Sequence, residues 1–395
     1  MPIGVYVSVP FCRTKCTYCN FASDVFSRAV FERYVDRVCE DIKHAERTAQ
    51  EMGGKFEREV DSIYLGGGTP TILESSQLQH IFEVLHREFD IRPDAETTVE
   101  CAPGTLSDIL LETLALCRVN RVSLGVQSFV DREAAAVGRL HKRESVLDDI
   151  GRLRAAGITN INIDLIAGLP HQTADSWEFS LAETLAAGVP HVSVYMLEID
   201  EDSRLGREVI AGGTRYHAHF VPDDDAMADF YVAACERLSA AGISHYEISN
   251  FARPEFESRH NLKYWKRRPY FGFGVDAHSM LVSDSAEFDS VRFANSDSPD
   301  RYVNGFRLQC DLLSRETALE ESFFLGLRLN QGVDLRELSV RFGKKAIAQF
   351  QGDIAELMEE ELLQSRGDVL VLTSLGRLLS NEVFERFIAQ TPAPS

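Results

Sequence analysis

The sequence lacks a long apolar run, an excess of basic charge and a second cluster of metal-binding residues. No apolar stretch approaches the ~20 residues that a membrane-spanning helix needs. The first residues, Met1–Val5, have neither the basic region nor the apolar stretch of an export signal. The 41 Lys and Arg residues face 61 Asp and Glu residues, giving a formal charge of −20, which argues against a nucleic-acid partner. We therefore expect a cytoplasmic protein that does not bind nucleic acid.

Three of the eight cysteines lie close together near the N-terminus, as Cys12, Cys16 and Cys19. A structural zinc site commonly uses two close pairs of ligands, and no second CxxC or HxxxH run completes one. A disulfide framework suits a shorter, exported chain better than this one. The remaining cysteines are scattered and fit buried apolar positions. They are Cys39, Cys101, Cys117, Cys235 and Cys310.

Three thiolates on one short loop match an iron–sulfur cube that keeps one iron open to another ligand. The loop follows an apolar stretch, Ile3–Val9, that reads as a β-strand. Four cysteine ligands would close such a cluster, whereas three leave a vacant coordination position. The sequence therefore predicts an open cluster centre, with zinc as the weaker alternative.

The first half of the chain alternates short apolar runs with amphipathic stretches, which is typical of parallel βαβ units. Six strands are too few for a closed eight-stranded barrel, so the pattern predicts an α/β open sheet or partial barrel. The predicted strands are Ile3–Val9, Ser62–Leu65, Thr97–Glu100, Arg121–Gly125, Asn160–Leu165 and His191–Leu197. The predicted helices lie near 27–51, 74–89, 105–117, 143–156 and 173–187.

This rhythm changes after about residue 200, where Asp223–Asp225 predict the start of a helix that runs to about Ala241. A polar, aromatic-rich stretch follows at 245–280. Residues 310–390 read as helices around a hairpin that includes Val369–Leu372. This last part is either winged-helix-like or a packing or partner-binding module. The predicted domains are 1–215, 216–300 and 301–395.

Polar or glycine residues stand where each predicted strand ends, and the ends of parallel strands meet at one mouth. They are Gly66–Pro70, Glu100, Gln127, Asp164, Tyr195 and Glu198, joined by Arg139 after the fourth strand. Each has a plainer interpretation on its own. The glycines also suit a tight turn, and Glu100 also suits a helix cap. Arg139 also suits a surface ion pair, and Asp164 a buried structural acid.

Five runs together resemble the oxygen-independent coproporphyrinogen III oxidase family of radical S-adenosylmethionine (SAM) proteins. They are Tyr6–Cys12, Cys16–Cys19, Gly66–Thr71, Gly125–Phe129 and Asp164–Pro170. The resemblance implies a partial (β/α)6 radical SAM barrel with a mainly helical, winged-helix-like C-terminal domain. It also implies a [4Fe-4S] cluster on the three cysteines, with SAM on the open iron. The implied SAM-binding residues are Tyr6, Tyr18, Gly67, Gly68, Thr69, Glu100, Gln127, Arg139 and Asp164.

The family has two branches, and three features of this sequence separate them. The oxidases resemble CxxxCxxCxC, whereas Phe21 stands at the extra cysteine position here. They also carry a substantial segment ahead of the motif, whereas eleven residues precede Cys12 here. The heme chaperones of HemW type share the signature HNxxYW, which this chain has within Arg259–Trp265. An imidazole beside Tyr and Trp suits heme, so His260 is the implied heme-binding residue, with His278 and His245 as alternatives.

The resemblance therefore implies a heme chaperone that binds heme and passes it to an acceptor protein. The alternative is a coproporphyrinogen III oxidase that decarboxylates propionate groups through a radical taken from SAM. The implied partners are the acceptor and a reductant for the cluster. Association with a membrane surface through the acceptor, and a homodimer, are left open.

Overall fold

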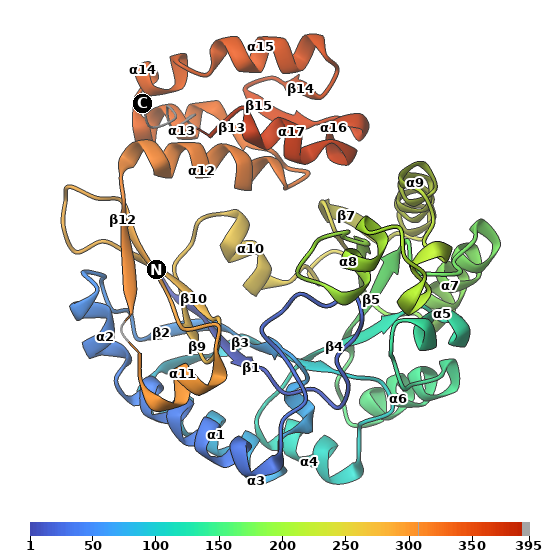
Figure 1. Ribbon diagram of the computed structural model, residues 1–395. Coiled ribbons are helices and arrows are strands. Elements are labelled where there is room, and N and C mark those ends of the chain that lie inside the picture. The colour runs from blue at the N-terminus through green and yellow to red at the C-terminus, as the bar shows by residue number, and fades with distance from the viewer. Residues whose placement is uncertain (307, 389–395) are drawn as a thin grey trace.

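The structure, a computed structural model, describes residues 1–306 and 308–388. Twelve strands form one curved sheet in the order β12-β11-β10-β9-β1-β2-β3-β4-β5-β6-β8-β7. Three further strands form a small sheet in the C-terminal domain. Figure 1 shows this domain, formed by α12 to α17, stacked on one side of the large sheet. Residue 307 and the last residues of the predicted C-terminal domain, 389–395, lie outside the described residues.

Six parallel strands follow one another in chain order, which is the arrangement of a partial (β/α)6 barrel and confirms the predicted fold class. The strands are β1 (Ile3–Val9), β2 (Glu59–Gly67), β3 (Asp90–Cys101), β4 (Arg121–Gln127), β5 (Asn160–Ala167) and β6 (His191–Met196). The helical segments between them are α1 (Arg28–Lys43), α2 (Ala45–Glu51), η1 (Pro70–Ile72), α3 (Ser75–Glu88), α4 (Asp108–Leu116), α5 (Asp131–Ala136), α6 (Arg143–Ala155) and α7 (Ala174–Ala187).

Several elements differ from the predicted ones: β2 is longer at both ends than the predicted Ser62–Leu65, α5 was not predicted, and two further differences have a clear cause. The helix expected over 27–51 is two helices, because the backbone leaves helical geometry at His44 between α1 and α2. The third strand, expected over Thr97–Glu100, begins at Asp90, because Asp90 and Ile91 pair with the start of β2. Both differences lie away from the strand ends that matter for the site.

The barrel strands alternate between apolar side chains under the helices and polar side chains inside the barrel. On β4, Val122, Leu124 and Val126 belong to the main hydrophobic core, whereas Arg121 and Ser123 occupy the opposite face and are also buried. Strands β1 and β5 alternate in the same way. The interior of the barrel is therefore a polar space walled by an apolar shell.

Both edges of the parallel sheet are extended by strands from the second half of the chain. Beside β6 lie β8 (Asn250–Ala252) and β7 (Ser244–Glu247), and beside β1 lie β9 (Tyr270–Phe273), β10 (His278–Val282), β11 (Ser290–Ala294) and β12 (Gln309–Leu313). The helices here are α8 (Arg204–Ile210), η2 (Arg215–Phe220), α9 (Asp224–Ala240), α10 (Arg259–Trp265) and α11 (Pro299–Asn304). Asp223 caps α9 as predicted, accepting from the backbone N–H of Ala226 at 2.9 Å. The domain limits at 215 and 300 stay predictions, since the sheet continues across both.

The C-terminal domain has its own hydrophobic core, built around Phe323, Phe350 and Phe387. Its strands are β13 (Val333–Asp334), β14 (Leu363–Arg366) and β15 (Val369–Leu372), so the predicted hairpin is confirmed. Its helices are α12 (Arg315–Leu327), α13 (Leu335–Phe342), α14 (Lys344–Ala348), α15 (Gln351–Glu359), α16 (Ser374–Leu378) and α17 (Ser380–Glu385). Among the helices of the described residues, none combines the length and apolar character that crossing a bilayer demands.

A buried ionic network joins this domain to the barrel. Arg267 is 7% exposed and donates from Nε to Glu321 of α12 at 2.7 Å and from Nη1 to Asp289 at 3.0 Å. Arg292 of β11 donates to the other oxygen of Glu321, also at 2.7 Å. Each buried charge therefore has an opposite partner, which a buried ion pair requires to offset its desolvation.

Candidate functional site at the barrel mouth

The three cysteines lie on the loop that leaves the C-terminal end of β1. Its start and return are tied together, because the Cys12 N–H donates to Asp24 O and the Asp24 N–H donates to Pro10 O, each at 3.0 Å. Cys16 is buried, and Cys12 and Cys19 are half-buried. Burial raises the pKa of the Cys12 thiol above its usual range. A metal centre at this loop would offset that cost by stabilising the thiolate.

The donor set at this loop suits a cluster better than one metal ion. Among the described residues, no group of three or more His, Cys, Asp or Glu side chains gathers tightly enough around a single ion. Ligands of one zinc ion all lie about 2.3 Å from the same centre. An iron–sulfur cube instead offers separate irons at separate corners, so its thiolates stand farther apart. The donor set, three soft sulfur atoms on one loop, fits such a cube.

The glycine triplet at the end of β2 packs directly against the cysteine loop. The Gly68 N–H donates to Val9 O and the Thr69 N–H donates to Phe11 O, both at 2.8 Å. A Cβ on Gly68 would stand 2.7 Å from Phe11 O, and Gly67 has φ +101°, which favours glycine. Here the triplet does more than make a turn, because it holds the loop backbone in place.

Glu100, at the end of β3, faces this same segment. Its Oε1 accepts from the Tyr64 hydroxyl at 2.8 Å, and its Oε2 accepts from the Gly67 N–H at 3.2 Å. Burial, followed by the nearby charge of Asp164, raises the pKa of Glu100 to about 7. The carboxyl group is therefore poised between its neutral and ionised forms, and a cationic ligand would favour the ionised one.

Among the described residues, the buried polar atoms near the cysteine loop that have no hydrogen-bond partner include Gln127 Oε1 and Arg139 Nε. Gln127 ends β4 with φ +67°, a strained conformation for a residue other than glycine. Arg139 donates from Nη1 to the Cys16 sulfur at 3.6 Å, and from Nη2 to the carbonyl of Gly125. Tyr18 also lies here, and burial raises the pKa of its hydroxyl. The unused donor and acceptor suit a polar ligand next to the cysteines.

Asp164, on β5, is held from two sides inside the barrel. It accepts from the Ser123 hydroxyl at 2.9 Å and from the Asn162 side-chain N–H at 2.7 Å. Burial raises the pKa of this carboxyl group as well. Tyr6 lies across the interior, with its ring 6.2 Å from that of Tyr64. The residues predicted to hold the cluster and SAM therefore lie around this mouth, except that Tyr6 lies deeper in the barrel, with its ring 6.3 Å from that of His260.

His260, the predicted heme-binding residue, lies on α10, away from the cysteine loop and near Ser62 and Glu96 of the barrel strands. Its Nδ1 lies 3.1 Å from Ser62 Oγ, and its Nε2 lies 2.8 Å from the Tyr264 hydroxyl. Its backbone N–H donates to Glu96 at 3.1 Å, and its side chain is 1% exposed. Burial lowers the pKa of the imidazole to about 3. Both ring nitrogens are thus occupied in this conformation, and binding heme iron requires one of these bonds to open.

The two alternative histidines lie in different surroundings. His278, at the start of β10, is exposed, with Nε2 3.9 Å from Asp276. His245 lies on β7, where its ring stacks on Phe251 with the centroids 4.4 Å apart. The role of each stays a prediction.

Polar residues that the sequence interpretation missed line the barrel interior. They are Thr98, Arg121, Ser123, Asn160, Asn162 and Ser193. The signal was present, since polar residues alternate with apolar ones along β4 and β5. These residues lie at the starts and middles of the strands, whereas the predicted site residues lie at the C-terminal ends.

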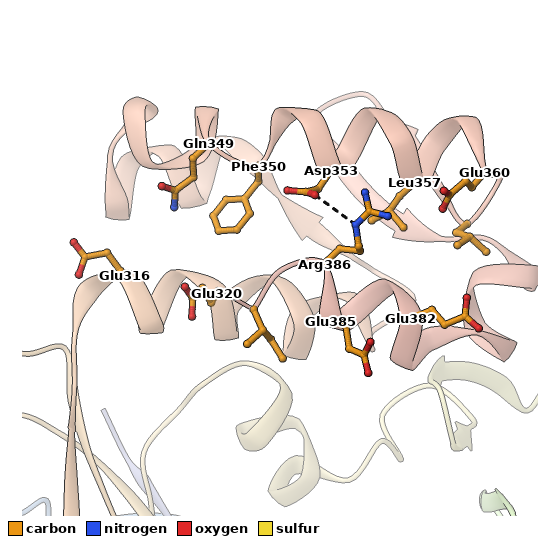
Figure 2. Close-up of a pocket in the computed structure, with 12 residues that line it drawn as sticks. Glu316, Glu320, Gln349, Phe350, Asp353, Leu357, Glu360, Glu382, Glu385 and Arg386 are labelled. Carbon is orange, nitrogen blue, oxygen red and sulfur yellow. Dashed lines mark hydrogen bonds and ion pairs between the residues drawn. The ribbon is translucent and has the colours of Figure 1, made fainter. Parts of the chain in front are cut away.

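A cavity of about 830 Å³ lies elsewhere, within the C-terminal domain. Figure 2 shows acidic side chains around an apolar floor that includes Phe350 and Leu357, with Arg386 bonded to Asp353. It shares no residue with the barrel mouth, so it is not part of the cluster site.

Comparison with known proteins agrees with this geometry. Residues 6–184 match the radical SAM superfamily, and residues 313–379 match the HemN C-terminal domain. A solved coproporphyrinogen III oxidase (HemN) from Escherichia coli, a radical SAM enzyme, has a similar fold, with a TM-score of 0.82 at 23% identity over 98% of this chain and 90% of that one. Fold and cysteine loop together define a radical SAM protein.

Relatives that are similar over nearly the whole chain identify one family within the radical SAM proteins. The heme chaperone HemW of Lactococcus lactis is 33% identical over 98% of this chain and 97% of its own length. HemW of Bacillus subtilis is 32% identical over 98% and 99%, and HemW of Escherichia coli 28% identical over 98% and 99%. The chain belongs to the HemW family of radical SAM proteins.

The raised pKa of Glu100 predicts a specific dependence of stability on pH. Folded Glu100 keeps its proton up to about pH 7, whereas an unfolded glutamate releases it near 4.5. The free energy of unfolding therefore falls as pH rises through this window, by about 3 kcal/mol for this one group. Glu100→Gln should remove that fall, and denaturant unfolding between pH 5 and 8 measures it. Glu112→Gln, at an exposed position of α4, should leave it intact. Equal pH slopes for wild type and Glu100→Gln would refute the assignment.

Proposed function

We propose that this protein is a heme chaperone that binds heme and transfers it to an acceptor protein. The observation that carries the proposal is similarity over nearly the full length to relatives named heme chaperone HemW. Phe21 adds to it, since the oxidase branch resembles a motif with a further cysteine at that position. The Phe21 side chain is 63% exposed beside the cysteine loop. The runner-up, coproporphyrinogen III oxidase, is supported by the same fold but not by this position.

The proposal includes a [4Fe-4S] cluster on Cys12, Cys16 and Cys19, with SAM at the open iron. When bound, the cluster and SAM supply radical chemistry once a reductant partner delivers an electron. Arg139 would bind the carboxylate of SAM, because a guanidinium matches a carboxylate in two parallel hydrogen bonds. Glu100 and Asp164 would accept hydrogen bonds from its ammonium or ribose groups. The remaining proposed contacts are Tyr6, Tyr18, Gly67, Gly68, Thr69 and Gln127.

We place the heme near the HNxxYW run on α10, with His260 as its binding residue. Trp265 of this run is covered by Arg328 of the C-terminal domain, whose guanidinium carbon lies 4.3 Å from a ring centroid of the indole. Figure 1 shows α10 between the barrel and that domain. A shift of the domain would uncover Trp265, and the imidazole of His260 would bind heme iron after leaving Ser62 or Tyr264.

Hemin titration followed by the Soret band tests this placement. His260→Ala should weaken hemin binding at least tenfold, which is ~1.4 kcal/mol. His80→Ala, an exposed histidine on α3, is the matched control and should bind hemin like the wild type. Unchanged binding by His260→Ala, with a loss in His278→Ala or His245→Ala, would move the heme ligand to that histidine.

The proposed partners follow from this function. Transfer requires an acceptor protein, and cluster reduction requires an electron donor. Association with a membrane surface through the acceptor, and a homodimer, are further proposals. A reducing cytoplasm is the proposed location, since it suits the thiolates of the cluster.

A further inference from the structure

Arg121 is an arginine buried inside the barrel at the far end from the cysteines. It is the first residue of β4 and is only 2% exposed. In the sheet register it stands between Thr98 of β3 and Asn160 of β5. Val122, the next residue, packs under the helices, so the guanidinium lies on the interior face.

This row of three residues carries unused hydrogen-bonding groups. Arg121 Nε, Thr98 Oγ1 and Asn160 Oδ1 are all buried and have no hydrogen-bond partner among the described residues. Arg121 also forms no ion pair there, although its charge is felt by Glu100 and Asp164 from beyond ion-pair distance. A buried cation without a partner is costly. Its retention points to a ligand that supplies the missing negative charge.

The carboxylate of SAM is already assigned to Arg139, which donates to the Cys16 sulfur beside the cluster loop. Gln127, the other end of β4, borders the cysteine loop, and six residue steps of ~3.3 Å put about 20 Å between the two ends. The row of Arg121 also borders α10, because Tyr64 of β2 pairs with Thr98 and its ring lies 5.4 Å from the ring of His260. The charge of Arg121 acts on His260 and Tyr246. His260 in turn contacts Ser62 and Tyr64.

We propose that Arg121 and Thr98 form a carboxylate subsite that receives a propionate group of the heme. This inference rests on the proposed function, and names the part of the ligand that the barrel recognises. The guanidinium fork binds a carboxylate through two parallel hydrogen bonds, and the threonine hydroxyl supplies a third. The side-chain amide of Asn160 can turn its N–H₂ toward the same anion, because amide oxygen and nitrogen exchange places on a flip. The porphyrin ring would stay at α10, outside the filled barrel.

Two ligands that differ only in their carboxylates test the proposal. Hemin carries two free propionates, and hemin dimethyl ester carries none. The wild type should bind hemin at least tenfold more tightly than the diester. Arg121→Gln should abolish this preference by weakening hemin binding while leaving diester binding within about twofold of wild type. Arg118→Gln removes an exposed arginine three residues earlier and should keep the full preference.

Thr98→Val provides a second variant that keeps the shape of the side chain. Its hydroxyl has no partner in the unliganded protein, so the variant should fold normally and bind hemin about threefold more weakly, with the diester unaffected. If Arg121→Gln does not fold, the hemin preference of Thr98→Val tests the subsite by itself. A full hemin preference in folded Arg121→Gln or Thr98→Val, or equal wild-type binding of both ligands, overturns the subsite. Failure of the wild type to bind either ligand instead refutes the proposed function.

Discussion

Replacing Cys19 by serine should reduce the iron and acid-labile sulfide of anaerobically reconstituted protein at least tenfold. The cluster would then be held by only two thiolates. Mutating a residue that merely hydrogen-bonds a metal ligand already weakens metal binding about 10–100-fold, so losing a direct ligand should weaken it at least as much. The broad visible absorbance of the cluster should disappear with the iron. SAM binding should weaken as well, because the open iron is one of its proposed anchors.

Cys310→Ser is the matched control for this experiment. Cys310 lies exposed on β12, away from the loop, and its replacement should leave iron, sulfide and absorbance at wild-type levels. Full iron content in the Cys19→Ser variant would refute the three-cysteine cluster. Loss of iron in both variants would point to general instability instead.

The Gly68→Ala substitution, which adds one methyl group, should impair the site almost as severely as Cys19→Ser. The new Cβ would lie 2.7 Å from Phe11 O and 2.8 Å from Val9 O, both backbone atoms of the segment that positions the cysteines. Relief requires the loop to move away from the end of β2. We expect Gly68→Ala to lower the free energy of unfolding by ~1–3 kcal/mol and to weaken SAM binding at least tenfold, as equilibrium dialysis would show.

Gly151→Ala controls for the general effect of replacing a glycine. Gly151 lies within α6, and a Cβ there meets nothing within 4 Å. Because alanine favours a helix over glycine by up to ~1 kcal/mol, this variant should be slightly stabilised. Wild-type SAM affinity in Gly68→Ala would show that the triplet is an ordinary turn.

The cysteine loop and strand ends were predictable because parallel strands bring their C-terminal ends to one mouth. Gly67, Glu100, Gln127 and Asp164 each follow from that rule together with their place after or within an apolar run. Because all six strands run in the same direction, residues at their C-terminal ends lie at one end of the barrel and residues at their starts lie at the other. Applying this rule requires only the order of strands and helices along the sequence.

Other features could not be predicted, because they depend on contacts between residues far apart in the sequence. The strand-end rule does not place the His260 motif, which lies on α10 against Ser62 and Glu96 of the barrel. Strands β9 to β12 extend the sheet because β9 pairs with β1, a partner more than 250 residues away in the sequence. The unpartnered state of Arg121 appears only once its neighbours are placed around it.

The most direct test of the heme chaperone account measures two reactions on one sample of anaerobically reconstituted protein with SAM and a reductant. One assay follows transfer of bound heme to apomyoglobin, as a probe acceptor, and the other follows carbon dioxide released from coproporphyrinogen III. We predict stable heme binding and transfer, without decarboxylation. Turnover of coproporphyrinogen without stable heme binding would contradict the account and identify the protein as an oxidase.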